Sequence, residues 1–313
     1  MKIFNRENTA ALMPFPKLIE AIKNIFIEGC QVPRRHIHAL DSDDENATLL
    51  IMPAWQKNRF LGIKHVTIYP DNGKKYGLPG LHSTYTLFDA ANGVPVAVLD
   101  GNTITNRRTA AASALAADSL ARKDASKLLI VGAGNVAQEL AAAYAAVRTL
   151  SRIQIWNINH EQAQAFAERL NQQGFLAEAV TDLAEAVADN DIISCATLST
   201  QPLILREWVQ PGSHIDLIGS FKPNMRESDD ALFADTSVFV DTSEALDKSG
   251  DLLSPMAAGI FSREAVKADL EALCRNEHPG RTSETEITVY KAVGAASEDL
   301  AAAVLVYEAD LAA

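Results

Sequence analysis

The chain has 313 residues, of which 48% are hydrophobic and 22% charged. Lysine and arginine together number 28 against 40 aspartates and glutamates, so the formal net charge is −12. A negative surface repels the phosphates of nucleic acids and anionic membranes, so we expect no partner of either kind. The composition excludes a fibrous or disordered chain, and the length favours two domains.

The three cysteines, Cys30, Cys195 and Cys274, lie far apart and form no CxxC pair. They indicate neither a zinc site nor a disulfide framework, so we expect buried thiols and no bound metal. The first fifteen residues lack the apolar core of a signal peptide, and no stretch reaches the roughly 18 apolar residues of a membrane helix. The sequence therefore predicts a cytoplasmic protein.

The N-terminal third predicts one helix and an antiparallel sheet. A helical pattern of apolar residues within 1–30 is followed by four short apolar runs, at 47–53, 62–69, 85–88 and 95–100. Turn-forming sequences such as DNG, GLPG and ANG separate these runs. Short apolar runs joined by such turns are typical of antiparallel strands.

The pattern changes at the alanine-rich segment 109–122, which predicts a helix beginning at Thr109 and the crossover between domains. Beyond it, strands and helices alternate, which is typical of a parallel sheet. The expected strands are 127–131, 153–157, 191–196, 213–219 and 237–241, with helices at 136–149 and 161–172. A last helix near the C-terminus is expected to pack back on the first domain.

A glycine-rich motif carries most of the information about function. The strand 127–131 runs directly into the sequence GAGNVA, which opens a helix. In this context the first glycine permits a tight turn, the second lets the backbone approach a pyrophosphate, and the final alanine keeps the helix close to the strand. The motif predicts dinucleotide binding, with the candidates Gly132, Gly134, Asn135 and Val136.

The end of the second expected strand bears on the choice of coenzyme. It reads Asn157-Ile158-Asn159-His160, where an NAD site usually has an acid for the ribose 2′-hydroxyl. The missing acid removes a repulsion toward a 2′-phosphate, but no arginine follows to bind one. The sequence thus slightly favours NADP(H) over NAD(H). Asn157 and Asn159 either bind the coenzyme or begin the next helix as caps.

Seven segments, in this order and spacing, resemble the ornithine cyclodeaminase/mu-crystallin family. The resemblance covers nearly the whole chain and implies an α/β fold: a Rossmann NAD(P)-binding domain at 116–294, and a β-rich α+β domain for substrate binding and dimerisation at 1–115 with 295–313. It further implies a homodimer that acts on small amino acids or cyclic imino acids. The segments are VPRR at 32–35, LIMPA at 50–54, LGIKHV at 61–66, DGN at 100–102 with RRTAA at 107–111, GAGNVA at 132–137, IGSFKPNMRE at 218–227 and YKAVG at 290–294.

By position, the resemblance places the family's substrate-carboxylate arginines on Arg35 and Arg108 and its active-site lysine on Lys64. Guanidinium groups hold a carboxylate bidentately with little freedom. A lysine on an apolar strand is costly if it faces the core unpaired, so Lys64 is expected in a polar site, with a pKa lowered by the two arginines; a solvated strand face is the alternative. It would donate a proton or contact the carboxylate. The arginines' sequence neighbours Arg34 and Arg107 should point away from the substrate site, because adjacent side chains of an extended segment alternate in direction.

Further candidate residues come from the resemblance or from the sequence itself, and some of them could equally serve the fold alone. Thr109 would meet a coenzyme phosphate or simply cap its helix. His82 follows a turn and is more often an ordinary loop residue. Glu298 and Asp299 are expected to cap or solvate the last helix. The remaining assignments are Met52 for the substrate, and Arg108, Gly219 and Val293 for the coenzyme.

Two departures from the family pattern favour imine reduction over ornithine cyclodeamination. Ornithine cyclodeaminases carry a glutamate and an aspartate where this chain has Leu50 and Phe221. Releasing ammonia and closing a ring needs such acid/base groups, whereas reducing a preformed cyclic imine needs a positioned carboxylate, a hydride and one proton. The resemblance thus favours the ketimine reductases, which reduce Δ1-pyrroline-2-carboxylate or Δ1-piperideine-2-carboxylate to L-proline or L-pipecolate. The alternatives are an alanine-dehydrogenase-like enzyme, an ornithine cyclodeaminase, and a crystallin-like nicotinamide-binding protein without catalysis.

Overall fold

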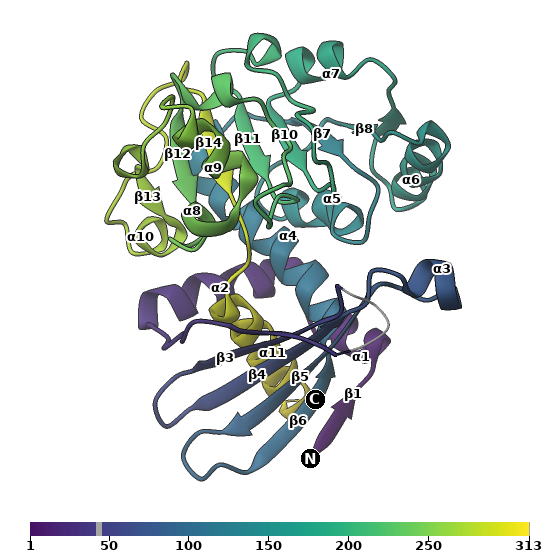
Figure 1. The fold of residues 1–313 in the computed structure, drawn as a ribbon, viewed down its shortest axis with the longest axis vertical. Coiled ribbons are helices and arrows are strands. Elements are labelled where there is room, and N and C mark those ends of the chain that lie inside the picture. The colour runs from purple at the N-terminus through teal and green to yellow at the C-terminus, as the bar shows by residue number, and fades with distance from the viewer. Residues whose placement is uncertain (42–45, 313) are drawn as a thin grey trace. The chain divides into compact units, whose positions relative to one another are not determined.

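The computed structural model describes residues 1–41 and 46–312, and its contacts divide the chain into two compact units (Figure 1). The first unit comprises Met1–Arg108 and Ala295–Ala313, and the second comprises Thr109–Gly294. The chain passes from one to the other within helix α4 (Gly101–Leu120). The boundary expected at 115/116 also lies inside this helix.

Helix α4 begins earlier than expected, which corrects the placement of Thr109. The first turn is capped by Asp100, whose Oδ1 accepts a hydrogen bond from the Thr103 backbone N–H at 2.7 Å. Thr109 is therefore a buried residue in the middle of the helix and not its N-cap. The predicted start at Thr109 is eight residues too late, because the prediction relied on the helix propensity of the alanine run. Asp100 followed by Gly101 is equally typical of a turn, so the true cap was not recognised.

The first unit is built on one mixed sheet, with strand order β1-β6-β5-β4-β3-β2 in the part of the chain that the structure describes. β1 runs parallel to β6, and the other neighbours are antiparallel, as the turn sequences predict. Its strands are β1 (Lys2–Phe4), β2 (His36–Ala39), β3 (Thr48–Trp55), β4 (Phe60–Ile68), β5 (Leu81–Asp89) and β6 (Pro95–Asp100).

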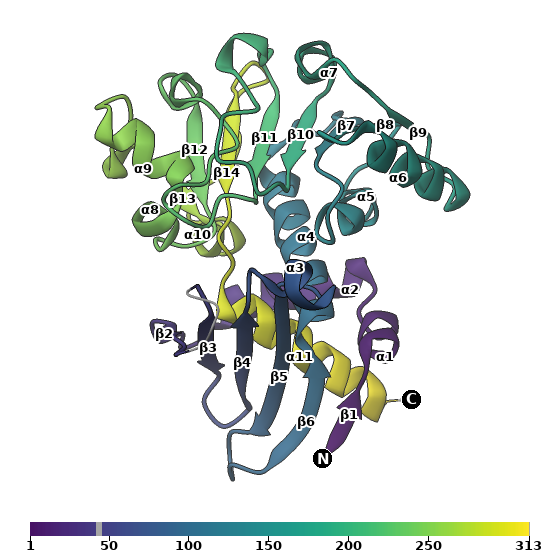
Figure 2. The same ribbon diagram turned by 45° about the vertical axis from the view of Figure 1, so that its right-hand side comes forward.

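Helix α11 (Ala296–Leu311) packs on this sheet against β3, β4 and β5, and α2 (Phe15–Glu28) packs against α11 (Figure 2). The short helices α1 (Arg6–Ala11) and α3 (Asn72–Tyr76) complete the unit. Because side chains alternate between the faces of a strand, alternate register rows of β3, β4, β5 and β6 are buried. One such row consists of Met52, Lys64, Tyr85 and Leu99.

The second unit is an open sheet in which every pair of neighbouring strands is parallel, in the order β13-β12-β14-β11-β10-β7-β8-β9. The sequence order reverses at β7, which lies between β8 and β10. In such sheets ligands bind at the carboxyl ends of the strands beside this reversal. The strands are β7 (Lys127–Val131), β8 (Arg152–Trp156), β9 (Ala177–Ala179), β10 (Ile192–Cys195), β11 (His214–Leu217), β12 (Ser237–Val240), β13 (Ala268–Asp269) and β14 (Thr288–Lys291).

Helices cover the second sheet, and its central strands are buried on both faces, as continuous apolar runs predict. The α-helices are α5 (Ala137–Ala145), α6 (His160–Gln172), α7 (Leu183–Asp189), α8 (Ala245–Lys248), α9 (Gly250–Ala257) and α10 (Leu270–Cys274), with 3₁₀ turns η1 (Arg206–Trp208), η2 (Asp230–Phe233) and η3 (Arg263–Ala265). Within 1–41 and 46–312, no helix is both long and apolar enough to cross a membrane.

Candidate functional site

Four charged side chains form a buried ion cluster in the first unit. Lys64 Nζ lies 2.6 Å from Asp299 Oδ2. Arg108 donates from Nη1 to Glu298 Oε2 at 2.8 Å and from Nε to Asp299 Oδ1 at 2.9 Å. None of the four residues is more than 5% exposed. Lys64 therefore faces a polar site inside the unit, and the solvated strand face is excluded.

The acids of the cluster come from the first turn of α11, where negative charge is favourable near the helix N-terminus. Glu298 caps this helix as expected, because its Oε2 also accepts the backbone N–H of Ala295 at 3.4 Å. The expectation that Glu298 and Asp299 are solvated is wrong. Their cationic partners lie about 190 residues or more away in sequence, and no local pattern indicates them.

Burial, together with the nearby charges of Arg108 and Arg35, lowers the pKa of Lys64 to about 8, although Asp299 opposes the shift. The arginines thus contribute as expected, but desolvation is the larger cause. Burial alone would raise the pKa of Asp299, yet Arg108 and Lys64 hold it below its ordinary value. The pair is therefore charged, with a lysine that is unusually ready to release its proton.

The charges of the cluster balance, since two cations face two anions. Arg35 is half-buried and close enough for its charge to act on Lys64, so it adds one positive charge to this region. One surplus positive charge suits a ligand with one carboxylate. In Arg108, Nε and Nη1 already bind the two acids, so those atoms would have to leave Glu298 and Asp299 to grip a substrate.

The sequence neighbours Arg107 and Arg34 point away from the ion cluster, as expected. Arg107 donates from Nη2 to the carbonyl of Met13 at 2.8 Å and stacks over the ring of Phe15. Arg34 is exposed. His82 is an exposed residue of β5. Met52 is buried in the same register row as Lys64.

Tyr85 was missed by sequence reasoning although it pairs directly with Lys64 across β4 and β5. Its hydroxyl is buried and makes no hydrogen bond within the described residues. A Cβ at Gly62 would lie 2.0 Å from this hydroxyl, so the tyrosine occupies the space that the glycine leaves. A glycine inside an apolar strand is the one signal in the sequence that could have indicated this close approach.

In the second unit, the glycine-rich turn fits a dinucleotide. Gly132 has φ +114°, and a Cβ there would lie 2.6 Å from the carbonyl oxygen of Ala196. Around Gly134 no atom lies within 4 Å of where a Cβ would be, so a pyrophosphate can approach the backbone. Gly134 and Asn135 are exposed, Val136 is half-buried, and α5 begins directly after them.

At the end of β8 the structure supports the capping role of the asparagines. Asn159 Oδ1 accepts the backbone N–H of Gln162 and caps α6. Asn157 donates from Nδ2 to the carbonyl of Asn159 and to Gln162 Oε1, both at 3.1 Å. Asn159 is exposed and Asn157 half-buried, so capping does not prevent contact with a ligand.

The backbone amides of the other coenzyme candidates have partners inside the protein. Gly219 N–H donates to Glu227 Oε2 at 2.6 Å, and Val293 N–H donates to Asp241 Oδ2, also at 2.6 Å. The N–H of Thr109 lies within α4. A coenzyme would therefore meet these residues through other atoms.

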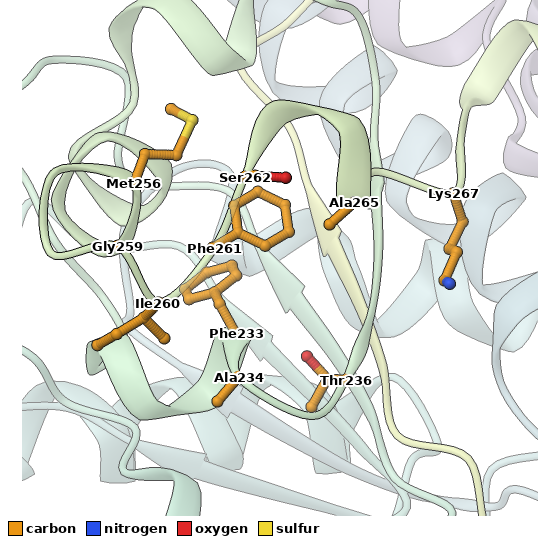
Figure 3. Close-up of a pocket in the computed structure, with 10 residues that line it drawn as sticks. All are labelled: Phe233, Ala234, Thr236, Met256, Gly259, Ile260, Phe261, Ser262, Ala265 and Lys267. Atoms are coloured by element: carbon orange, nitrogen blue, oxygen red, sulfur yellow. The ribbon is translucent and has the colours of Figure 1, made fainter.

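A separate cavity of about 530 Å³, lined by both polar and apolar side chains, lies in the second unit beside η2 and α9. Figure 3 shows the rings of Phe233 and Phe261 at its centre, 5.7 Å apart between centroids. None of the site residues expected from the sequence lines it. Among the described residues, no group of three histidine, cysteine, aspartate or glutamate side chains could hold a metal.

Comparison with known proteins identifies the class. The model of the ornithine cyclodeaminase/mu-crystallin family matches residues 7–312, so the chain belongs to this family. It is 40% identical to a Δ1-pyrroline-2-carboxylate reductase of Paracoccus denitrificans, over 90% of this chain and 88% of the relative. The resemblance inferred from the motifs is confirmed.

Solved structures agree with this assignment and confirm the fold class. The structure of Thermococcus litoralis Δ1-pyrroline-2-carboxylate reductase in complex with NADH and L-proline has a TM-score of 0.93 and 32% identity, covering 100% of this chain and 98% of that one. An archaeal alanine dehydrogenase dimer with bound NAD has a TM-score of 0.91 and 28% identity, covering 100% and 96%. The similar proteins include NAD(P)-dependent imine reductases.

Proposed function

We propose that this protein is an NAD(P)H-dependent reductase of cyclic imino acids, which converts Δ1-pyrroline-2-carboxylate to L-proline and Δ1-piperideine-2-carboxylate to L-pipecolate. The observation that carries the proposal is Lys64, buried with Asp299 and Arg108 in a chain whose second unit has a dinucleotide-binding turn. The 40% identity to the Paracoccus reductase and the likeness to the proline-bound Thermococcus reductase support it.

In this proposal, residues of the first unit bind the substrate and protonate it. Arg35 and Arg108 bind the 2-carboxylate of the imine and fix the face that C2 presents, with Met52 beside them. The bound coenzyme supplies the hydride. Lys64 holds a proton at Nζ and gives it to the ring nitrogen, so that C=N becomes CH–NH. Lys64 then regains a proton from solvent.

Neither position that carries an acid in ornithine cyclodeaminases has one here. Leu50 is a half-buried residue of β3, and Phe221 is 40% exposed. The carboxylates of the ion cluster, Glu298 and Asp299, already neutralise Lys64 and Arg108. This argues against the cyclodeaminase alternative, because no unengaged acid of the cluster serves as its acid/base group.

The proposal is tested by mixing purified protein with NADH or NADPH and each cyclic imine, and following the absorbance of the reduced coenzyme. We expect imine-dependent oxidation, and no ammonia from ornithine in a parallel reaction. Ammonia and proline from ornithine would support a cyclodeaminase instead. Oxidation of the coenzyme that requires pyruvate and ammonia would support an alanine dehydrogenase. Tight coenzyme binding without turnover would support a crystallin-like binding protein.

The role of Lys64 predicts a pH dependence. Only protonated Lys64 can donate, and its pKa is about 8, so kcat/KM should fall as the pH rises above about 8. Asp299 raises this pKa, so Asp299→Asn should move the fall to lower pH. Replacing Lys64 by alanine should lower kcat/KM by about 10²–10⁴-fold, the usual contribution of a positioned acid or base.

The control for this series is Lys74→Ala, which removes an exposed lysine of α3 from the same unit. Its pH profile and rate should match the unaltered protein. The proton-donor role is wrong if Lys64→Ala keeps kcat/KM within about threefold, a difference near 0.6 kcal/mol. It is equally wrong if Asp299→Asn leaves the position of the alkaline fall unchanged.

We propose that both coenzymes are accepted, with a small preference for NADPH, since no carboxylate stands at Asn157 to repel a 2′-phosphate. Asn157→Asp should turn the preference toward NADH by about ten- to a hundredfold in kcat/KM, the range for a hydrogen bond to a charged group. Gln173→Glu adds the same charge at the other end of α6 and should leave the ratio unchanged. An unaltered ratio in Asn157→Asp would contradict the proposed contact.

We also propose a homodimer; the cytoplasmic location stays a prediction. The dimeric archaeal alanine dehydrogenase of similar structure supports the assembly. In the first unit α11 contacts one face of the sheet, while Ile51, Ile63 and Val98, on alternate positions of their strands, are only half-buried. Light scattering should give twice the chain mass of 33.8 kDa. A mass of one chain at micromolar concentration would contradict it.

A further inference from the structure

A buried carboxylate in the second unit ties together the loops that follow two neighbouring strands. Glu227 is fully buried. Its Oε1 accepts the backbone N–H of Thr197 at 2.7 Å and the hydroxyl of Thr197 at 2.8 Å. Its Oε2 accepts the backbone N–H of Gly219 at 2.6 Å. Thr197 follows β10 and Gly219 follows β11, and these strands are paired in parallel.

The position of Glu227 is itself fixed by a second layer of buried charges. Asp251 Oδ1 accepts the backbone N–H of Glu227 at 2.8 Å and that of Ser228 at 3.1 Å. Lys291 Nζ lies 3.3 Å from Asp251 Oδ2 and donates to the carbonyl of Leu217 at 2.9 Å. Lys291 thus offsets the buried negative charge and connects this layer to β11 and β14.

These loops pack so closely that their relative placement leaves little freedom. A Cβ at Gly219 would lie 1.9 Å from the carbonyl oxygen of Thr197. The same segment lies against the glycine-rich turn, since a Cβ at Gly132 would be 2.6 Å from the Ala196 oxygen and 3.3 Å from Thr197 Cγ2. The loops after β7, β10 and β11 therefore form one packed edge, and Glu227 supplies the hydrogen bonds that join two of them.

This edge is where a coenzyme binds in an open parallel sheet, at the carboxyl ends of the strands beside the reversal of strand order. We infer that Glu227 is a positioning residue for the nicotinamide coenzyme, which fixes the loops after β10 and β11 against the glycine-rich turn. The inference rests on the proposed function only in requiring that the second unit bind NAD(H) or NADP(H). Glu227 reaches the coenzyme through Thr197 and Gly219 and needs no contact of its own.

The test is the dissociation constant of NADH and of NADPH for the full-length protein without substrate, measured by calorimetry. Glu227→Gln keeps the shape of the side chain but turns an –NH₂ group toward the N–H of either Thr197 or Gly219, so one loop loses its tether. We expect the dissociation constant to rise by about tenfold, because coenzyme binding must then also fix the released loop, at a cost on the scale of one hydrogen bond.

A matched control exists at the opposite edge of the same sheet. Asp191 Oδ2 accepts the backbone N–H groups of Ser126 and Lys127 at 2.9 and 3.0 Å, so it joins the beginnings of β7 and β10. Asp191→Asn should lower the urea midpoint of unfolding, as Glu227→Gln does, and leave both dissociation constants within about twofold. A merely structural effect would weaken coenzyme binding equally in the two variants.

Three outcomes would overturn the inference. The first is a Glu227→Gln protein that binds coenzyme within about twofold of the unaltered protein. The second is an Asp191→Asn protein whose dissociation constants for the coenzymes rise as much as those of Glu227→Gln. If Glu227→Gln fails to fold, Thr197→Val replaces it; this change removes the hydroxyl that donates to Glu227 and accepts the Ser199 N–H, and it should raise the dissociation constant several-fold. Unchanged binding in Thr197→Val is the third. Unaltered protein that binds neither coenzyme would overturn the proposed function as well, so the two failures are distinguishable.

Discussion

The contact between Lys64 and Asp299 is the constraint on which the first unit depends. Burying a charged group costs several kcal/mol unless a partner of opposite charge meets it in good geometry. Lys64 lies in a buried register row of the sheet, so it needs such a partner inside the unit. That partner arrives only when the last helix of the chain returns to β3, β4 and β5. The charge of Lys64 is thus met only in the discontinuous unit, in which α11 also buries an apolar face.

The parts of the fold that were predictable from sequence are those whose signals are local. The strand, glycine turn and helix at residues 127–145 follow one another, and the antiparallel strands of the first unit are indicated by alternation and turns. The ion cluster has no such signal, because 190 residues separate Arg108 from Glu298 and 191 from Asp299. The family resemblance supplied Lys64 and Arg108, but only the folded chain shows that two acids neutralise them.

Buried acids serve different purposes in the two units. In the first, Glu298 and Asp299 neutralise cations. In the second, Glu227 and Asp241 accept backbone N–H groups of loops that follow strands. The family resemblance proposes Gly219 and Val293 for the coenzyme, but it could not show that these tethers already engage their backbone amides. A family motif identifies a residue, but it does not show which atoms of that residue are still able to bind a ligand.

The same ion pair that completes the first unit also sets the acidity of the group proposed to donate a proton. A lysine at its ordinary pKa of 10.5 would hold its proton too tightly to be an effective acid near neutral pH. Burial and the two arginines would by themselves lower the pKa further. Asp299 opposes that fall, and the result of about 8 keeps Lys64 mostly protonated at pH 7 yet poised to release its proton. Asp299 therefore serves both the fold, as the partner of a buried charge, and the proposed chemistry, because it raises the pKa of Lys64.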